Sequence, residues 1–203
     1  MITYIILGIT ILVSIAAMEN HDLKNKMMFN AYAIHEHKQW YRFFSHGLIH
    51  GDWMHLGFNM LSFYMFGKGV EEGFGFIFGG KGMLFFILLY VGGLAMSSLY
   101  SYERNKNNMY YNALGASGAV SAVIYAYILL DPTARIGMMF IPIRVPAYIF
   151  GFIYLGIEYY LSKRGNTGIA HDAHFWGAVY GIVFTLILKP SLASSFVDQI
   201  TGR

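Results

Sequence analysis

A serine set among small residues is the feature of this sequence with the clearest chemical potential. Ser117 lies in the stretch Gly115-Ala116-Ser117-Gly118, at the start of an apolar run long enough to cross a bilayer. A serine hydroxyl becomes a nucleophile only when a base beside it takes its proton. Small-residue clusters in membrane helices commonly mark packing faces, so Ser117 alone does not establish chemistry.

A second group near the end of the chain supplies a base. His174, Gly177 and Gly181 are spaced three and four residues apart, so they share one face of a helix. The two glycines allow a neighbouring helix to approach at backbone distance. If that neighbour carries Ser117, His174 comes within hydrogen-bonding reach of the serine. Asp172 points away from His174 on a helix, which leaves a Ser-His dyad as the simpler arrangement.

A third group is rich in histidine and supplies hydrogen-bond donors. His55 and Asn59 are four residues apart and lie on one helical face, where both side chains can donate to an oxyanion. Interhelical packing contacts explain the same pair equally well. His46, His50 and His55 have the loose spacing of possible metal ligands. Asp52 is the one carboxylate close to them in the sequence, and no metal site is expected.

The elements that must position these groups are membrane helices. Of the 203 residues, 56% are hydrophobic and 12% are charged, which is about half the charged fraction of a typical soluble domain. The apolar residues fall in blocks of about 20, the length that crosses a ~30 Å hydrocarbon core. Lipid offers backbone groups no hydrogen-bond partner, so each block is expected to be helical.

Apolar blocks separated by polar breaks predict six transmembrane helices. They cover residues 2–18, 50–70, 82–100, 113–130, 146–161 and 170–188. A polar, aromatic segment, residues 19–45, separates the first block from the second. No Lys or Arg precedes the first block, so a retained helix is favoured over a cleaved signal peptide. Residues 1–203 are therefore expected to form a single all-α, six-helix membrane domain.

Charge and cysteine content exclude other classes of protein. The net charge is +3, but the basic residues are scattered through the loops and form no stripe for nucleic acid. Cysteine is absent, which excludes disulfides and a thiolate nucleophile. Six spans place both termini on one side, and Lys and Arg are too evenly divided between the two sides to decide which is cytoplasmic.

Taken in order along the chain, these residues resemble the rhomboid family of intramembrane serine proteases. The resemblance covers nearly the whole chain and is similar to the minimal six-helix form of bacterial members. Its elements are Arg42-Phe43-Phe44-Ser45-His46, His50, His55, Asn59, Gly67, Glu71, the Gly115–Gly118 stretch, and Ala173-His174 followed by Gly177 and Gly181. Each element is a weak pattern alone, and their order makes the combination specific.

The resemblance implies a role for each group. Ser117 would be the nucleophile and His174 the general base. His55, Asn59 and the Ser117 backbone N–H would form the oxyanion hole. The residues implied to be structural are Arg42, His50, Glu71, Gly115, Gly118, Gly177 and Gly181. No cofactor or metal is implied. The partners would be the lipid bilayer and single-pass transmembrane substrates, in a bacterial inner membrane with the termini in the cytoplasm.

Two departures from the family pattern affect the expected site. Tyr41 separates Trp40 from Arg42, where the family often has the tryptophan directly before the arginine. Ser121 stands one turn after the nucleophile, where an aromatic residue commonly stacks on the catalytic histidine. His174 is therefore expected to be held by Ser121 Oγ or by an aromatic residue from another helix.

The sequence leaves two alternatives to an intramembrane serine endopeptidase. An inactive relative would bind transmembrane helices without cutting them, although both side chains of the expected dyad are present. A small metal or solute transporter would need a continuous polar path, and residues 82–100 and 146–161 offer almost none. Glu158, near the end of the second of these blocks, is its one ionisable residue. The helix after Ser117 is expected to be short or tilted, with the serine at the floor of a wet cavity.

Overall fold

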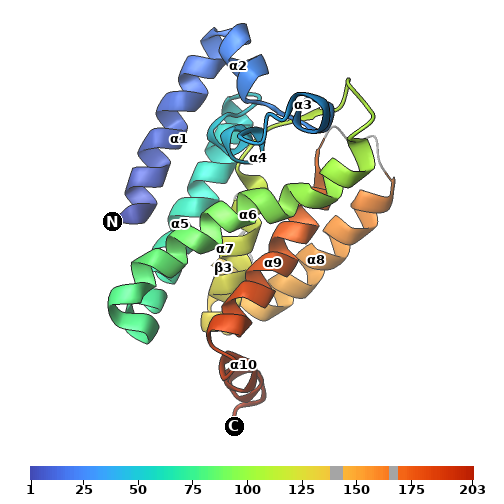
Figure 1. The fold of residues 1–203 in the computed structure, drawn as a ribbon. Helices are drawn as coiled ribbons and strands as arrows, with labels where there is room; N and C mark the ends of the chain where they lie inside the picture. Colours follow the sequence, from blue (N-terminus) through green and yellow to red (C-terminus); the bar gives the residue numbers. More distant parts are fainter. Residues whose placement is uncertain (138–143, 165–168) are drawn as a thin grey trace.

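The computed structural model describes residues 1–137, 144–164 and 169–203, which are mostly helical (Figure 1). Helices occupy all the apolar blocks: α1 (Ile2–Glu19), α5 (Trp53–Phe78), α6 (Gly82–Asn105), α7 (Ser117–Leu130), α8 (Ala147–Arg164) and α9 (His171–Leu188). A short helix, α10 (Leu192–Thr201), follows α9 where only a tail was expected. Strands β3 (Arg135–Gly137) and β4 (Arg144–Pro146) pair antiparallel between α7 and α8.

Length and composition alone identify fewer spans than six. Among the described residues, Ile2–Glu19 and Trp53–Asn105 are long and apolar enough to cross a membrane, and α9 with α10, bent by 108°, gives a third candidate. A straight helix over the second stretch would be about 80 Å long. The chain instead reverses at η2 (Gly79–Lys81), where Gly79 has a φ of 56°, and forms α5 and α6 (Figure 1). The fold is therefore a helical membrane fold, and six spans remain a prediction.

Two helix starts differ from the expected boundaries because polar contacts set them. Helix α5 begins at Trp53, after residue 50, since Asp52 Oδ1 accepts the His55 backbone N–H at 2.8 Å and caps the helix. Residues 113–116 are not helical. Strand β2 (Asn112–Ala113) pairs antiparallel with β1 (Phe29–Asn30), and α7 begins only at Ser117.

The segment between α1 and α5 has its own structure. Its elements are α2 (His21–Met27), β1, α3 (Ala31–His37), α4 (Arg42–Ser45) and η1 (His46–Leu48). The buried Arg42 guanidinium ties them together, because it donates to the backbone oxygens of Asn25 at 2.9 Å and Met28 at 2.5 Å. Arg42 Nε also donates to Gln39 Oε1 at 2.6 Å. Arg42 therefore organises this segment and lies away from the cavity described below.

Both aromatic residues before Arg42 have packing partners. Trp40 stacks on Phe43, with ring centroids 6.3 Å apart and an interplanar angle of 10°. The Arg42 guanidinium lies 5.6 Å from the centroid of the Tyr41 ring. The two aromatic residues therefore have different contacts. Trp40 packs against Phe43 within the segment, and the Tyr41 ring lies against the Arg42 guanidinium.

Helices α7 and α9 meet at backbone distance because glycines line their contact. A Cβ at Gly177 would lie 2.1 Å from the Gly118 backbone oxygen, and one at Gly181 would lie 2.2 Å from that of Ala122. No side chain fits at such separations. The close approach expected from the spacing of the two α9 glycines is thus present, and its partner is the helix that carries Ser117 (Figure 1).

Candidate active site

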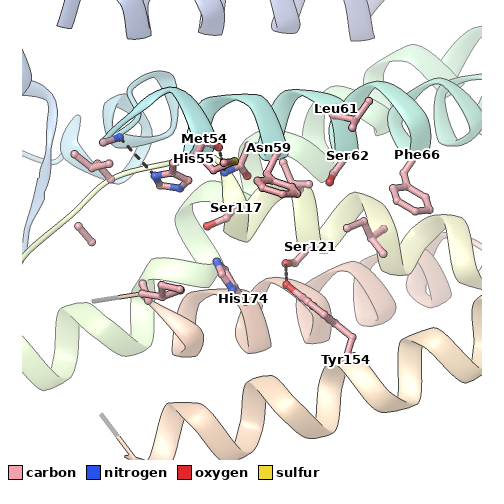
Figure 2. Close-up of a pocket in the computed structure, with 18 of the residues that line it drawn as sticks. Met54, His55, Asn59, Leu61, Ser62, Phe66, Ser117, Ser121, Tyr154 and His174 are labelled. Carbon is pink, nitrogen blue, oxygen red and sulfur yellow. Dashed lines mark hydrogen bonds between the residues drawn. The ribbon is translucent and has the colours of Figure 1, made fainter. Parts of the chain in front are cut away.

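An open cavity of about 1190 Å³ lies beside the start of α7, between α5, α8 and α9. His55 and Asn59 from α5, Ser117 from α7 and His174 from α9 all line it (Figure 2). Helix α7 has 14 residues and is therefore about 21 Å long, which is too short to cross the ~30 Å core. The chain before Ser117 consequently lies within the bundle as non-helical backbone, which is tolerated at membrane depth where it is buried in protein or lines a water-filled cavity.

Ser117 is the first residue of α7, so its backbone N–H lies at the N-terminus of the helix. The first backbone N–H groups of a helix have no intrahelical acceptor, and here the first such bond runs from Val120 N–H to Ala116 O at 2.9 Å. Ser117 lines the cavity, so its backbone N–H and the positive end of the helix dipole lie beside it. An oxyanion formed by attack of Ser117 Oγ would develop at this position.

His174 lies beside Ser117 in the cavity (Figure 2). Its Nδ1 is 3.2 Å from Oε1 of Glu158, on α8, which leaves Nε2 as the ring nitrogen available to the serine. Ser121 Oγ was one expected support for His174, but it lies 3.3 Å from the Tyr154 hydroxyl. The carboxylate of Glu158 supports His174 where Ser121 or an aromatic ring was expected.

His55 and Asn59 present donors on the α5 side of the cavity. The Gly51 N–H donates to His55 Nδ1 at 3.5 Å, so the neutral ring carries its hydrogen on Nε2. Asn59 Nδ2 donates to the His55 backbone oxygen at 3.0 Å and retains a second N–H. A Cβ at Gly115 would lie 2.7 Å from His55 Nε2, and the φ of Gly115 is 115°. Glycine at 115 therefore lets the His55 ring lie against the backbone that precedes Ser117.

Two buried histidines also hold this backbone. The Gly115 N–H donates to the His46 backbone oxygen at 2.9 Å, and the Ala116 N–H donates to His50 Nε2 at 3.4 Å. His50 Nδ1 therefore carries the hydrogen and donates to Ser14 Oγ of α1, 2.9 Å away. His50 thus connects α1 to the backbone directly before the nucleophile candidate, which is a structural position.

Burial keeps these two loop histidines neutral. It lowers the pKa of His46 from 6.5 to about 4. The pKa of His50 is lowered from 6.5 to about 3, first by burial and then by the neighbouring His55. Because the neutral His50 ring has a free lone pair on Nε2, it can accept the Ala116 N–H, and its protonation would remove that contact.

Glu71 and Asp172 lie outside the reacting group. Glu71 of α5 accepts the backbone N–H groups of Ile2 at 2.7 Å and Thr3 at 3.0 Å, so it caps the start of α1. Asp172 Oδ2 accepts the hydroxyl of Ser101, on α6, at 2.5 Å. Asp172 therefore points away from His174, as its spacing on the helix predicted.

Glu158 and His171 are the residues to which the sequence assigned no role in the site. His171 Nδ1 lies 2.6 Å from Glu158 Oε2, so one carboxylate contacts two histidines of α9. A lone acidic residue in an apolar helix is a functional hypothesis by default, and that signal was present at position 158. Its partners are in another helix, which no spacing rule within α8 could reveal.

The apolar helices around an open cavity, with a serine and a histidine facing into it, define a helical integral-membrane protein. The family model described as the rhomboid domain matches residues 37–191. This chain belongs to the rhomboid family.

Two plant proteins from Arabidopsis thaliana are similar to the chain. RHOMBOID-like protein 12, mitochondrial, is 30% identical over 144 residues, which cover 66% of this chain and 42% of the relative. Rhomboid-like protein 11, chloroplastic, is 29% identical over 197 residues, which cover 90% and 64%. The chain thus spans less than two thirds of either relative. Their names refer to mitochondria and chloroplasts, so they give no support to the expected bacterial inner membrane.

Proposed function

We propose that the protein is an intramembrane serine endopeptidase that hydrolyses peptide bonds in or near transmembrane segments of single-pass membrane proteins. The observation that carries this proposal is the placement of Ser117, His174, His55 and Asn59, from three helices, around one open cavity (Figure 2). Membership of the rhomboid family supports the same reaction class. The proposal includes six spans with both termini on the cytoplasmic side.

In the proposed reaction, Ser117 Oγ attacks the scissile carbonyl carbon while His174 Nε2 takes the hydroxyl proton. The new oxyanion accepts hydrogen bonds from the Ser117 backbone N–H, His55 Nε2–H and the Asn59 amide. His174 then gives its proton to the leaving amine as the C–N bond breaks. Water that enters through the open cavity hydrolyses the acyl-enzyme and restores Ser117.

The substrate class follows from the shape of the site. An intact transmembrane helix keeps its carbonyl groups in internal hydrogen bonds, so the scissile segment must be extended when it reaches Ser117. The resemblance to the rhomboid family implies small residues at the cleavage site. A single-pass helix that frays near the membrane surface, with small residues at the cleavage site, is the substrate that best satisfies both conditions.

The decisive experiment compares the wild type with Ser117→Ala and His174→Ala after reconstitution with a model single-pass substrate. Wild type should cleave the substrate and react with a fluorophosphonate at Ser117, and both variants should lose cleavage. Equal cleavage by wild type and Ser117→Ala would refute the proposal. Binding of the substrate by a wild type that neither cleaves nor reacts would identify an inactive relative instead.

A further inference from the structure

Glu158 of α8 is a buried carboxylate that the reaction above does not use. Its side chain is 8% exposed, and its two oxygens contact two histidines of α9. Oε1 lies 3.2 Å from His174 Nδ1, and Oε2 lies 2.6 Å from His171 Nδ1. A buried carboxylate is costly unless its oxygens accept hydrogen bonds, and these two ring nitrogens provide them.

The contacts determine which nitrogen of His174 carries the hydrogen. An ionised carboxylate only accepts hydrogen bonds, so His174 Nδ1 must be the donor to Glu158. The neutral ring then has its free lone pair on Nε2, the nitrogen available to Ser117, which lies beside the ring (Figure 2). Without the carboxylate, the tautomer with hydrogen on Nε2 also becomes accessible, and that tautomer cannot take the serine proton.

Regular helix spacing on α8 places the Glu158 carboxylate beside His174. Tyr154 and Glu158 are four residues apart and share one face of α8. The Tyr154 hydroxyl lies 3.3 Å from Ser121 Oγ, one turn beyond Ser117 on α7. His171 and His174, three residues apart on α9, both contact Glu158 from the other side. The face of α8 that contacts α7 is therefore the face that carries Glu158 to His174.

We propose that Glu158 is a positioning residue for His174. Its carboxylate holds the ring with Nε2 available to Ser117 and stabilises the imidazolium that forms when His174 takes the serine proton. His171 binds the second carboxylate oxygen and so orients Glu158. The inference rests on the proposed protease function and replaces the expected two-residue arrangement with one in which a carboxylate from α8 supports the base.

The same three side chains also have the composition of a divalent metal site. Among the described residues, Glu158, His171 and His174 form a group whose ligand atoms all lie within 4.8 Å of one another. The contacts favour the positioning role, because each carboxylate oxygen pairs with one ring nitrogen at a hydrogen-bonding distance. Binding of Zn²⁺ is the competing outcome that the experiment must distinguish.

The first test measures cleavage by the full chain in proteoliposomes with a model single-pass substrate. Glu158→Gln keeps the size of the side chain and removes its charge. We expect kcat to fall by about 10²- to 10⁴-fold, with KM changed by less than about twofold. Glu158→Asp, which retains a carboxylate, should recover part of the loss. Asp172→Asn is the matched control and should cleave as wild type does, because Asp172 hydrogen-bonds Ser101.

The outcomes separate this inference from the protease proposal. If wild type cleaves and Glu158→Gln has the same kcat, the positioning role is refuted and the protease function stands. If wild type does not cleave under any condition that admits substrate, the protease function itself is refuted.

A second measurement does not depend on cleavage, and its main result comes from the wild type. ¹⁵N NMR of histidine-labelled wild type in detergent micelles reports the tautomer of His174, whose signal is assigned by its loss in His174→Ala. We expect the hydrogen on Nδ1 in wild type and a mixture of tautomers in Glu158→Gln. A wild-type ring with its hydrogen on Nε2 would overturn the inference. Stoichiometric Zn²⁺ binding that is lost in Glu158→Gln would also overturn it and assign the group as a metal site.

Discussion

At the scale of single residues, the chemistry depends on which hydrogens point into the cavity. The Gly51 N–H donates a hydrogen bond to His55 Nδ1, so Nε2–H is the donor that His55 offers to the cavity. Asn59 donates one amide N–H to the His55 backbone oxygen and keeps the other free to donate. These donors would act only when negative charge forms on the substrate. Their contribution is therefore expected in kcat and not in substrate affinity.

His55→Ala or Asn59→Ala should each lower kcat by about 10²- to 10³-fold with little change in KM, because one oxyanion donor is lost. Steady-state cleavage of the model substrate measures both constants. Ser62→Ala is the control, since Ser62 lies on the same helix and cavity wall but farther from Ser117 (Figure 2). A rise in KM alone for either variant would mean that the side chain binds substrate and does not stabilise the oxyanion.

The residues of the candidate site divide into those that sequence could predict and those that it could not. Ser117, His174, His55 and Asn59 were predictable because helical spacing and an ordered set of motifs select them. Glu158 was visible as an isolated charge in an apolar block, but its pairing with His174 depends on how α8 packs against α9. No periodicity within one helix contains that information.

At the scale of elements, the glycines of α9 set the distance between the two helices that carry Ser117 and His174. Gly177→Ala would place a Cβ 2.1 Å from the Gly118 oxygen and force the helices apart, at a cost of about 1–3 kcal/mol. We expect a lower unfolding midpoint in detergent and a loss of cleavage, because His174 moves with α9. Gly156→Ala on α8 is the matched control, since no atom lies within 4 Å of its added Cβ. Equal effects of the two substitutions would contradict this explanation.

The helices were predictable from apolar blocks, whereas the polar connections were not. Asp52 moves the start of α5, and pairing of β2 with β1 keeps residues 113–116 out of α7. Both effects come from hydrogen bonds with particular partners, which hydropathy does not register. The same is true of the segment between α1 and α5, whose structure depends on hydrogen bonds from Arg42 to the backbone oxygens of Asn25 and Met28, far from it in the sequence.

At the scale of the whole molecule, two buried loop histidines make stability depend on pH. The pKa values of His46 and His50 fall from 6.5 to about 4 and about 3 in the folded protein. Below about pH 6.5 the unfolded chain therefore binds protons that the folded protein does not, and stability is lost as the pH decreases. The expected loss by about pH 4 is roughly 3 kcal/mol for each histidine.

Unfolding in detergent at several pH values measures this dependence. His50→Gln should weaken it, because glutamine does not titrate and its amide oxygen can still accept the Ala116 N–H. His21→Gln, at an exposed position of α2, should leave the dependence as in wild type. A wild-type stability that is constant from pH 7 to about pH 4 would show that His46 and His50 titrate alike in both states.

The hydrogen bonds from Ser14 through His50 to Ala116 also bear on how this protein can be divided. The region that matches the rhomboid domain, residues 37–191, begins after α1 and so excludes Ser14. A fragment cut at that boundary would retain both members of the proposed dyad and lose the partner of His50 Nδ1. A unit that keeps these hydrogen bonds must therefore include Ser14, and a truncation designed from the family boundary would remove one support of the backbone that precedes Ser117.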